Sequence, residues 1–242
     1  MQHETNIIFD QSFNEAQLKR HAESFSSDII VRNTSDIILE EINLLKEVHK
    51  RSFAKVGAIN FFPSAPMAYE EFDCAHKYDL IISNLVLHHE NDLIKTLTSY
   101  KQSLNENGVL LATMFGGSTL KELRRILEKT ELELKGGVSP RVIPMIDVKD
   151  AGRLMQMAKF SQVVATIDEI VVMYKNFRDM INHPRKIGQS NCMHLRNKLY
   201  LGKNFLKAAG THAQVYFGEE DFSSSFDIIS LTGANTSPLF SS

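Results

Sequence analysis

The stretch YDLIISNLVLHHENDLIKTLTSYKQSLNENGVLLATMF, residues 78–115, decides the fold. It opens with a nearly continuous apolar run at residues 78–83, which is typical of a strand buried on both faces of a parallel sheet. Asn91 or Asp92 can cap the helix that follows, and residues 109–115 form a second buried run. This alternation of strand and helix predicts an α/β fold, and right-handed crossovers then require a parallel sheet.

The flanking sequence extends the same pattern in both directions. Upstream, we expect two helices and one short strand before Pro63 interrupts regular structure. Downstream, helical and β-prone segments continue to alternate until a frayed tail. The expected elements are helices at residues 13–25 and 36–48 (the second capped by Ser35 or Asp36), a strand at 56–62, a turn at 105–108, a helix at 118–134 capped by Ser118, a helix at 147–159, two short strands within 160–174, helices at 177–187 and 193–209, a strand at 226–231 and a tail at 232–242.

The length of 242 residues predicts one large domain with a small extension. We place the helical N-terminal extension at residues 1–52 and the α/β domain at residues 53–242. A hydrophobic fraction of 43 % and a charged fraction of 23 % are typical of a globular chain. The basic residues (27) and acidic residues (29) give a net charge of -2, which does not favour nucleic acid as a partner.

The sequence also bears on the cellular compartment. No apolar run approaches the ~20 residues of a membrane span, so no span is expected. Residues 1–10 carry acidic side chains and no basic start, which does not favour a signal peptide. The two cysteines are too few for a disulfide framework and lack metal-ligand spacing, so we expect a reducing cytoplasm and no metal.

Three groups of residues follow the expected strands, where α/β proteins bind ligands: residues 83–89, residues 116–118 and residues 63–73. His88 and His89 lie in the first group, but adjacent residues point to different faces and make poor joint metal ligands. His88 alone is a candidate hydrogen-bonding or general-base residue, and a satisfied structural histidine is the alternative. Gly116, Gly117 and Ser118 can form either an anion-binding nest or a simple strand-to-helix turn.

Arg141 is a further candidate, within the loop GGVSPRVIP at residues 136–144. Its guanidinium could bind a carboxylate or phosphate of a ligand in a two-pronged manner. A solvated loop or an internal ion pair is an equally good interpretation. Glu128, Glu131 and Glu133 are interpreted as a solvated helix face.

Residues 78–124 resemble the segment from the fourth to the fifth strand of class I S-adenosylmethionine-dependent methyltransferases. A narrower resemblance covers residues 116–160 and the segments IDEIVVMY, GQSNCMHLR and FDIISLTG. It indicates a branch that contains malonyl-carrier-protein methyltransferases and the arginine hydroxylases of mitochondrial complex I assembly, with bacterial homologues. The segment FDQSFNEAQLKRHAESF, residues 9–25, is similar to the helical entry of this branch. The resemblance implies a Rossmann-like three-layer methyltransferase fold.

The glycine-rich cofactor motif of that family is absent. The family begins its sheet with a D-x-G-x-G-x-G segment, whose glycines let the backbone approach the cofactor closely. Gly57 is the one glycine before residue 100 in this chain. We therefore expect the fold to lack its first strand–loop–helix unit. Carried over residue by residue, the resemblance implies a remaining cofactor side formed by Glu71 (with Glu70 beside it), Ser83, Asn84, Leu85 and His88, and it puts Arg141 on the substrate side.

Three hypotheses for function remain open from the sequence. The first is a methyltransferase that uses S-adenosylmethionine on a protein or small-molecule acceptor. The second is a degenerate, non-catalytic assembly or interaction protein, because the cofactor loop is missing while the substrate-side segments remain. The third is a protein-arginine hydroxylase, which would need an oxidant or metal that the sequence does not reveal. A shortened sheet also favours a homodimer through an exposed edge.

Overall fold

The computed structural model describes residues 7–22, 24, 27–45, 53–56, 70–197, 202–218 and 221–236. Its described strands form one mixed six-stranded sheet in the order β2-β1-β3-β4-β6-β5. Strands β2, β1, β3 and β4 are parallel to one another, and β6 pairs antiparallel with both β4 and β5. The strands are β1 (Phe53–Val56), β2 (Glu70–Glu71), β3 (Tyr78–Asn84), β4 (Leu104–Phe115), β5 (Ser161–Tyr174) and β6 (Phe222–Ala234).

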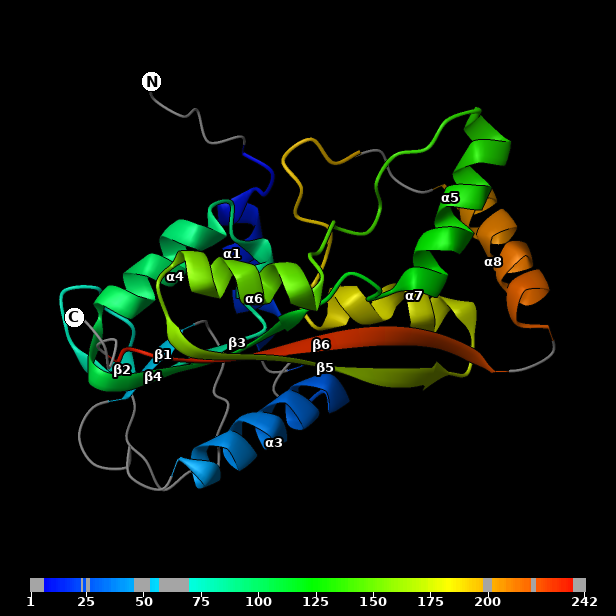
Figure 1. Cartoon of the computed structure of the whole chain (residues 1–242). Coiled ribbons are helices and arrows are strands. Elements are labelled where there is room, and N and C mark those ends of the chain that lie inside the picture. The colour runs from blue at the N-terminus through cyan, green and yellow to red at the C-terminus, as the bar shows by residue number, and fades with distance from the viewer. Residues whose placement is uncertain are drawn as a thin grey trace.

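Helices cover both faces of this sheet, which gives three layers (Figure 1). One face packs against α4 and α6, through side chains such as Leu97 and Met155. The other face packs against α3, α5, α7 and α8, through side chains such as Ile38, Leu123 and Met180. The helices are α1 (Gln11–Arg20), α3 (Ile29–Leu44), α4 (Leu93–Gln102), α5 (Lys121–Lys135), α6 (Val148–Met157), α7 (Phe177–Lys186) and α8 (Lys203–Phe217), with a 3-10 turn, η1, at Leu87–His89.

The central elements confirm the sequence analysis. Strand β3 is buried at six of its seven positions, as a near-continuous apolar run predicts. Asp92 caps α4 by accepting a hydrogen bond from the Lys95 N–H, and Asp147 caps α6 in the same way from Asp150. The three-layer α/β architecture is therefore as expected, but the expected parallel sheet is mixed, because β6 runs antiparallel to both β4 and β5. The division into an extension and a domain at residue 52 stays a prediction.

Several boundaries at the N-terminal side were wrong. The first helix ends at Arg20 rather than near residue 25. Helix α3 starts six or seven residues before the expected cap, because Asp28, and not Ser35 or Asp36, accepts the Ile30 N–H. The strand expected at 56–62 is β1, at residues 53–56, and residues 57–62 lie outside the described part of the chain.

Other boundaries were wrong in the C-terminal half. The turn expected at 105–108 is a bulge within β4, since Tyr78 pairs with Leu104 and Leu80 with Val109. Strand β5 is continuous over fourteen residues, and β6 extends through residues 232–234, which were expected to fray. The helix expected at 193–209 is α8, which begins at Lys203 after a loop.

The N-terminal segment connects parts of the chain that are distant in sequence. Phe9 forms a β-bridge with Met193, and the Asp10 N–H donates to the Cys192 carbonyl at 2.8 Å. Asn91 accepts from the Ile8 and Phe9 N–H groups and donates to the Phe9 carbonyl. Helix α1 is therefore fixed beside the loop at residues 187–197, near the carboxyl ends of β3 and β4.

Candidate functional site

The carboxyl end of β3 is packed into the protein interior. Ser83, Asn84 and Leu85 are fully buried. Thr113 on β4 donates a hydrogen bond to the Asn84 Oδ1, and the Leu85 N–H donates to the Thr113 carbonyl at 2.9 Å. Leu85 has a φ of 53° and its side chain belongs to the core shared with α3 and α5. These three side chains face protein, and neither of the two cavities described below is lined by them.

His88 and His89 follow in η1 and are also buried, at 5 % and 1 % exposed. The His88 Nε2 lies 2.9 Å from the Gln189 Oε1, and the two imidazole rings lie 4.0 Å apart. Burial lowers the pKa of His88 to about 4, and burial together with the neighbouring His88 lowers the pKa of His89 well below its ordinary value. Both rings are therefore neutral near pH 7. Within the described residues no group of three potential ligands could hold a metal ion.

The acidic side of the expected cofactor site is only partly described. Glu71 lies on the short outer strand β2 and is exposed. Gly57 and the rest of residues 57–69 lie outside the described residues. The assignment of Glu71, Ser83, Asn84, Leu85 and His88 to a cofactor therefore stays a prediction.

Residues Gly116 to Ser118 form a strand-to-helix turn, one of the two alternatives left open. The N–H of Ser118 donates to the Asp227 Oδ2 at 2.9 Å, and the N–H of Gly116 donates to the Asp227 carbonyl. These two N–H groups are therefore hydrogen-bonded within the protein and are not free to bind an anion. Ser118 does not cap α5, whose preceding residue is Leu120 with a φ of 57°. Helix α5 is instead tied to β6 through Glu122, which accepts from the N–H and hydroxyl of Ser225.

Arg141 forms a buried ion pair with Glu131, which was wrongly expected to be solvated. The Arg141 Nη2 lies 2.7 Å from the Glu131 Oε1, with the side chains 10 % and 2 % exposed. Burial alone would raise the pKa of Glu131, but hydrogen bonds from Arg141, Ser139 and Lys135 outweigh it and lower the pKa to about 2. The pair fixes the 136–144 loop to α5, so an internal ion pair, left open as an alternative, is one role of Arg141.

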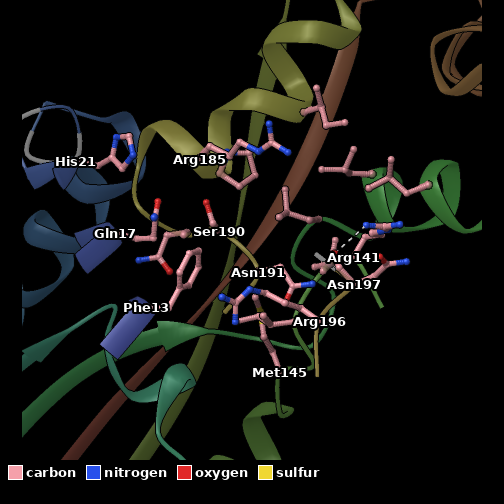
Figure 2. A pocket seen from close by; sticks show the side chains of 18 of the residues that line it. Phe13, Gln17, His21, Arg141, Met145, Arg185, Ser190, Asn191, Arg196 and Asn197 are labelled. Atoms are coloured by element: carbon pink, nitrogen blue, oxygen red, sulfur yellow. Dashed lines mark hydrogen bonds between the residues drawn. The ribbon is translucent and has the colours of Figure 1, made fainter. Parts of the chain in front are cut away.

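A cavity of about 600 Å³ lies where α1, α5, α7 and the loops around Arg141 and Gln189 meet. Figure 2 shows Gln17 reaching it from α1, His21 from the position directly after α1, Arg185 from α7, and Arg141 from the opposite side. Apolar side chains of α1, α5, α7 and the 141–145 segment form part of its lining. Its described lining contains four arginines and no carboxylate. The arginines are Arg20, Arg141, Arg185 and Arg196.

Two of these arginines are held in place by carboxylates outside the lining. Arg141 pairs with Glu131, and the Arg196 Nη1 lies 3.1 Å from the Asp10 Oδ2 while its guanidinium stacks 3.9 Å over the Phe13 ring. The Arg141 Nε and the Gln189 Nε2 are buried and have no hydrogen-bond partner among the described residues. Since buried donors are normally satisfied, these two atoms point to a ligand group or water.

Sequence reasoning found Arg141 but missed the other arginines and Gln189. Arg20 and Arg185 lie in the last turns of α1 and α7, where basic residues are common for reasons of helix capping alone. Gln189 comes from a loop 101 positions after His88, its hydrogen-bond partner. No spacing rule joins such residues, because only the packing of α1 and α7 brings them together.

Comparison with known proteins gives several relatives, although no protein-family model matches the sequence. The chain is 36 % identical over 171 residues to the mitochondrial arginine-hydroxylase NDUFAF5 of Danio rerio, covering 69 % of this chain and 53 % of that protein. It is 36 % identical over 143 residues to the human NDUFAF5, covering 59 % and 41 %. The chain thus spans about half or less of these relatives' length.

More distant similarities include a methyltransferase. A malonyl-[acyl-carrier protein] O-methyltransferase of Xylella fastidiosa is 26 % identical over 152 residues, covering 62 % of this chain and 50 % of that protein. The solved structure of the YcgJ protein from Bacillus aligns over 83 % of this chain and all of that chain, with a TM-score of 0.46 and 11 % identity.

Proposed function

Because the chain belongs to the class I methyltransferase superfamily, in the branch of the NDUFAF5 arginine hydroxylases, we propose that it is a methyltransferase-like protein with a degenerate cofactor site. It then acts by binding a ligand or partner group in the cavity beside α1, α5 and α7, as an assembly or interaction protein. One observation carries the proposal. The side chains expected to bind the cofactor, from Ser83 to His88, face the protein interior, while Arg141 lines an open cavity.

The described residues at the sheet edge do not fit S-adenosylmethionine. The cofactor needs close backbone approach, and the sequence has one glycine, Gly57, where the family has several. The cofactor also needs side chains that are free to contact it. The Asn84 Oδ1 instead accepts a hydrogen bond from Thr113, and the His88 Nε2 is hydrogen-bonded to Gln189. Leu85 points into the core. We therefore derive no reaction step through this cofactor.

A thermal-shift titration with S-adenosylmethionine and S-adenosylhomocysteine, backed by calorimetry, tests this proposal. A ligand at 100 times its dissociation constant stabilises the fold by about 2.7 kcal/mol. For a chain of this size that is a shift in Tm of roughly 5–10 °C. We expect no saturable shift up to millimolar ligand, with ATP as a control for non-specific nucleotide effects. A saturable shift with heat of binding would overturn the proposal.

A second candidate function is S-adenosylmethionine-dependent methyl transfer to a small molecule or protein. The Asn84 Nδ2 and the His88 Nδ1 favour it, because both are buried without a partner at the carboxyl end of β3. A ligand acceptor atom there would satisfy them. If the titration saturates, Asn84→Asp should weaken binding at least tenfold, because it removes the donor and adds a negative charge.

Arginine hydroxylation, the activity in the names of the NDUFAF5 relatives, is a third candidate. A substrate guanidinium is a cation, and the described lining of the cavity offers four guanidiniums and no carboxylate to bind it. The cavity therefore does not support this activity. Mass spectrometry of an arginine peptide incubated with the protein would test it directly, by a gain of one oxygen atom.

The proposal also covers the cellular location of the chain and its association with a second copy. No helix among the described residues is long and apolar enough to cross a membrane. The relatives at 36 % identity are named as mitochondrial, and a cytoplasmic location of this chain stays a prediction. A homodimer also stays a prediction. Its support is the edge strand β5, where Val164, Val171 and Met173 are more than half exposed, and light scattering of the purified protein would test it.

A further inference from the structure

Two of the four cavity arginines have no charge partner among the residues that the structure describes. Arg20 and Arg185 are exposed, and across the described residues neither has a hydrogen-bond or ion-pair partner. Arg141 and Arg196 are each paired with one carboxylate, Glu131 and Asp10. Over the described residues the cavity therefore has an excess of two positive charges, which attracts an anion to it.

The positive charge continues beyond the cavity. A second cavity of about 450 Å³ shares Ile181 and Arg185 with the first and lies between α7 and α8. Its described lining adds Arg178, Lys203 and Lys207 and again contains no carboxylate. Such a basic approach concentrates anions near Arg185 and speeds their association.

The rest of the lining indicates what the anion is attached to. Helix α5 contributes Leu123 and Leu127, Leu120 directly before it adds a third leucine, and the facing segment contributes Ile143 and Met145. A volume of about 600 Å³ is within the range of small-molecule sites. The unpartnered donors of Arg141 and Gln189 are the polar atoms that can orient a ligand oxygen.

We propose that this cavity binds a small organic anion, with its carboxylate or phosphate at Arg20 and Arg185 and its apolar body against α5. The inference rests on the proposed function, because it names the ligand class of the same cavity. Arg141 and Arg196 shape the site and donate to the ligand, while their ion pairs to Glu131 and Asp10 keep them in position.

The test uses calorimetric titration of the full chain with three matched probes of equal length: hexanoate, hexyl phosphate and neutral hexanamide. We expect at least one of the two anions to bind at least tenfold more tightly than hexanamide, and the stronger of the two identifies the head group. The double variant Arg20→Gln with Arg185→Gln should remove that difference. The matched control is Arg32→Gln with Arg125→Gln, two exposed arginines outside the cavity, which changes the net charge equally and should retain it.

The outcomes separate this inference from the function on which it rests. Equal binding of hexanoate, hexyl phosphate and hexanamide, or equal loss in both double variants, would overturn the anion site and leave the degenerate cofactor site standing. Saturable S-adenosylmethionine binding in the earlier titration would overturn the degenerate site, whatever the result with these anions.

Discussion

Glu131 shows how one residue can organise the loop that borders the cavity. Its carboxylate accepts from the Arg141 guanidinium at 2.7 Å, from the Ser139 N–H at 2.9 Å and from the Ser139 hydroxyl. Only 2 % of its side chain is exposed. Such a buried pair is costly to break, because the remaining partner keeps an uncompensated charge away from water.

We predict that Glu131→Gln lowers the free energy of unfolding by about 3 kcal/mol at pH 7, because it leaves the Arg141 charge buried and unpaired. The folded pKa of Glu131, about 2, lies below its ordinary value of 4.5, so its stabilisation is complete above pH 4.5 and is lost as the pH falls toward 2. The difference in free energy of unfolding between wild type and Glu131→Gln should therefore be about 2 kcal/mol smaller at pH 3 than at pH 7. Urea denaturation at both pH values measures it.

Glu128→Gln is the matched control for this prediction, since Glu128 lies on the same helix and is only partly buried. It should change stability by less than about 0.5 kcal/mol at either pH. A gap between wild type and Glu131→Gln that stays constant from pH 7 to pH 3 would contradict the role given to the carboxylate.

At the scale of elements, the turn between β4 and α5 depends on a glycine that contacts β6. A Cβ on Gly116 would lie 3.0 Å from the Asp227 Cβ and 3.1 Å from the Ile229 side chain. We predict that Gly116→Ala destabilises the fold by about 1–3 kcal/mol, because β6 must move. At Gly117 the nearest atom would be 3.6 Å away, so Gly117→Ala should be close to neutral. Thermal unfolding of the two variants decides; equal Tm values would refute the close contact.

Helix α3 provides a second test at this scale. Asp28 caps it through the Ile30 N–H and also accepts from the His183 Nε2 at 2.8 Å, which in turn lies beside the Tyr174 hydroxyl. We predict that Asp28→Ala costs about 1–2 kcal/mol, from the lost cap and the stranded imidazole. Asp36→Ala, at the cap position expected from sequence, should cost less than about 0.5 kcal/mol because that side chain is exposed within the helix. Denaturation followed by circular dichroism measures both, and a larger loss for Asp36→Ala would reverse the assignment.

At the scale of the whole molecule, sequence patterns predicted what depends on neighbours along the chain. The apolar run at 78–83 and the caps at Asp92 and Asp147 are local, and they predicted β3, α4 and α6 correctly. Asp28 caps α3 through the Ile30 N–H, which is also a local contact, but Ser35 and Asp36 fit the same cap pattern and the pattern alone does not choose among the three. Glu131 looked solvated because nothing in its helix shows that the Arg141 loop folds back over it. The cavity likewise depends on packing between segments far apart in sequence.

The pair His88 and His89 joins those segments and makes the whole fold sensitive to acid. His88 bonds Gln189 of the 187–197 loop, while Phe9 packs edge-to-face against His89 and Gln11 donates to the His89 carbonyl. Burial lowers the pKa of His88 to about 4, against 6.5 in the unfolded chain. As the pH falls below 6.5, protons bind the unfolded chain first, so stability is lost progressively down to pH 4.

We predict that the free energy of unfolding falls by about 2 kcal/mol from pH 8 to pH 5 through His88 alone, with a further loss from His89. His88→Gln should remove about 2 kcal/mol of that pH dependence, whatever it does to stability at pH 8. His76→Gln is the control, because the His76 side chain is 63 % exposed and should leave the pH dependence unchanged. Urea denaturation at each half pH unit gives the profile. A wild-type profile that is flat from pH 8 to pH 5 would mean that the imidazoles reach water in solution, and the carboxyl end of β3 would then be open enough to admit a ligand after all.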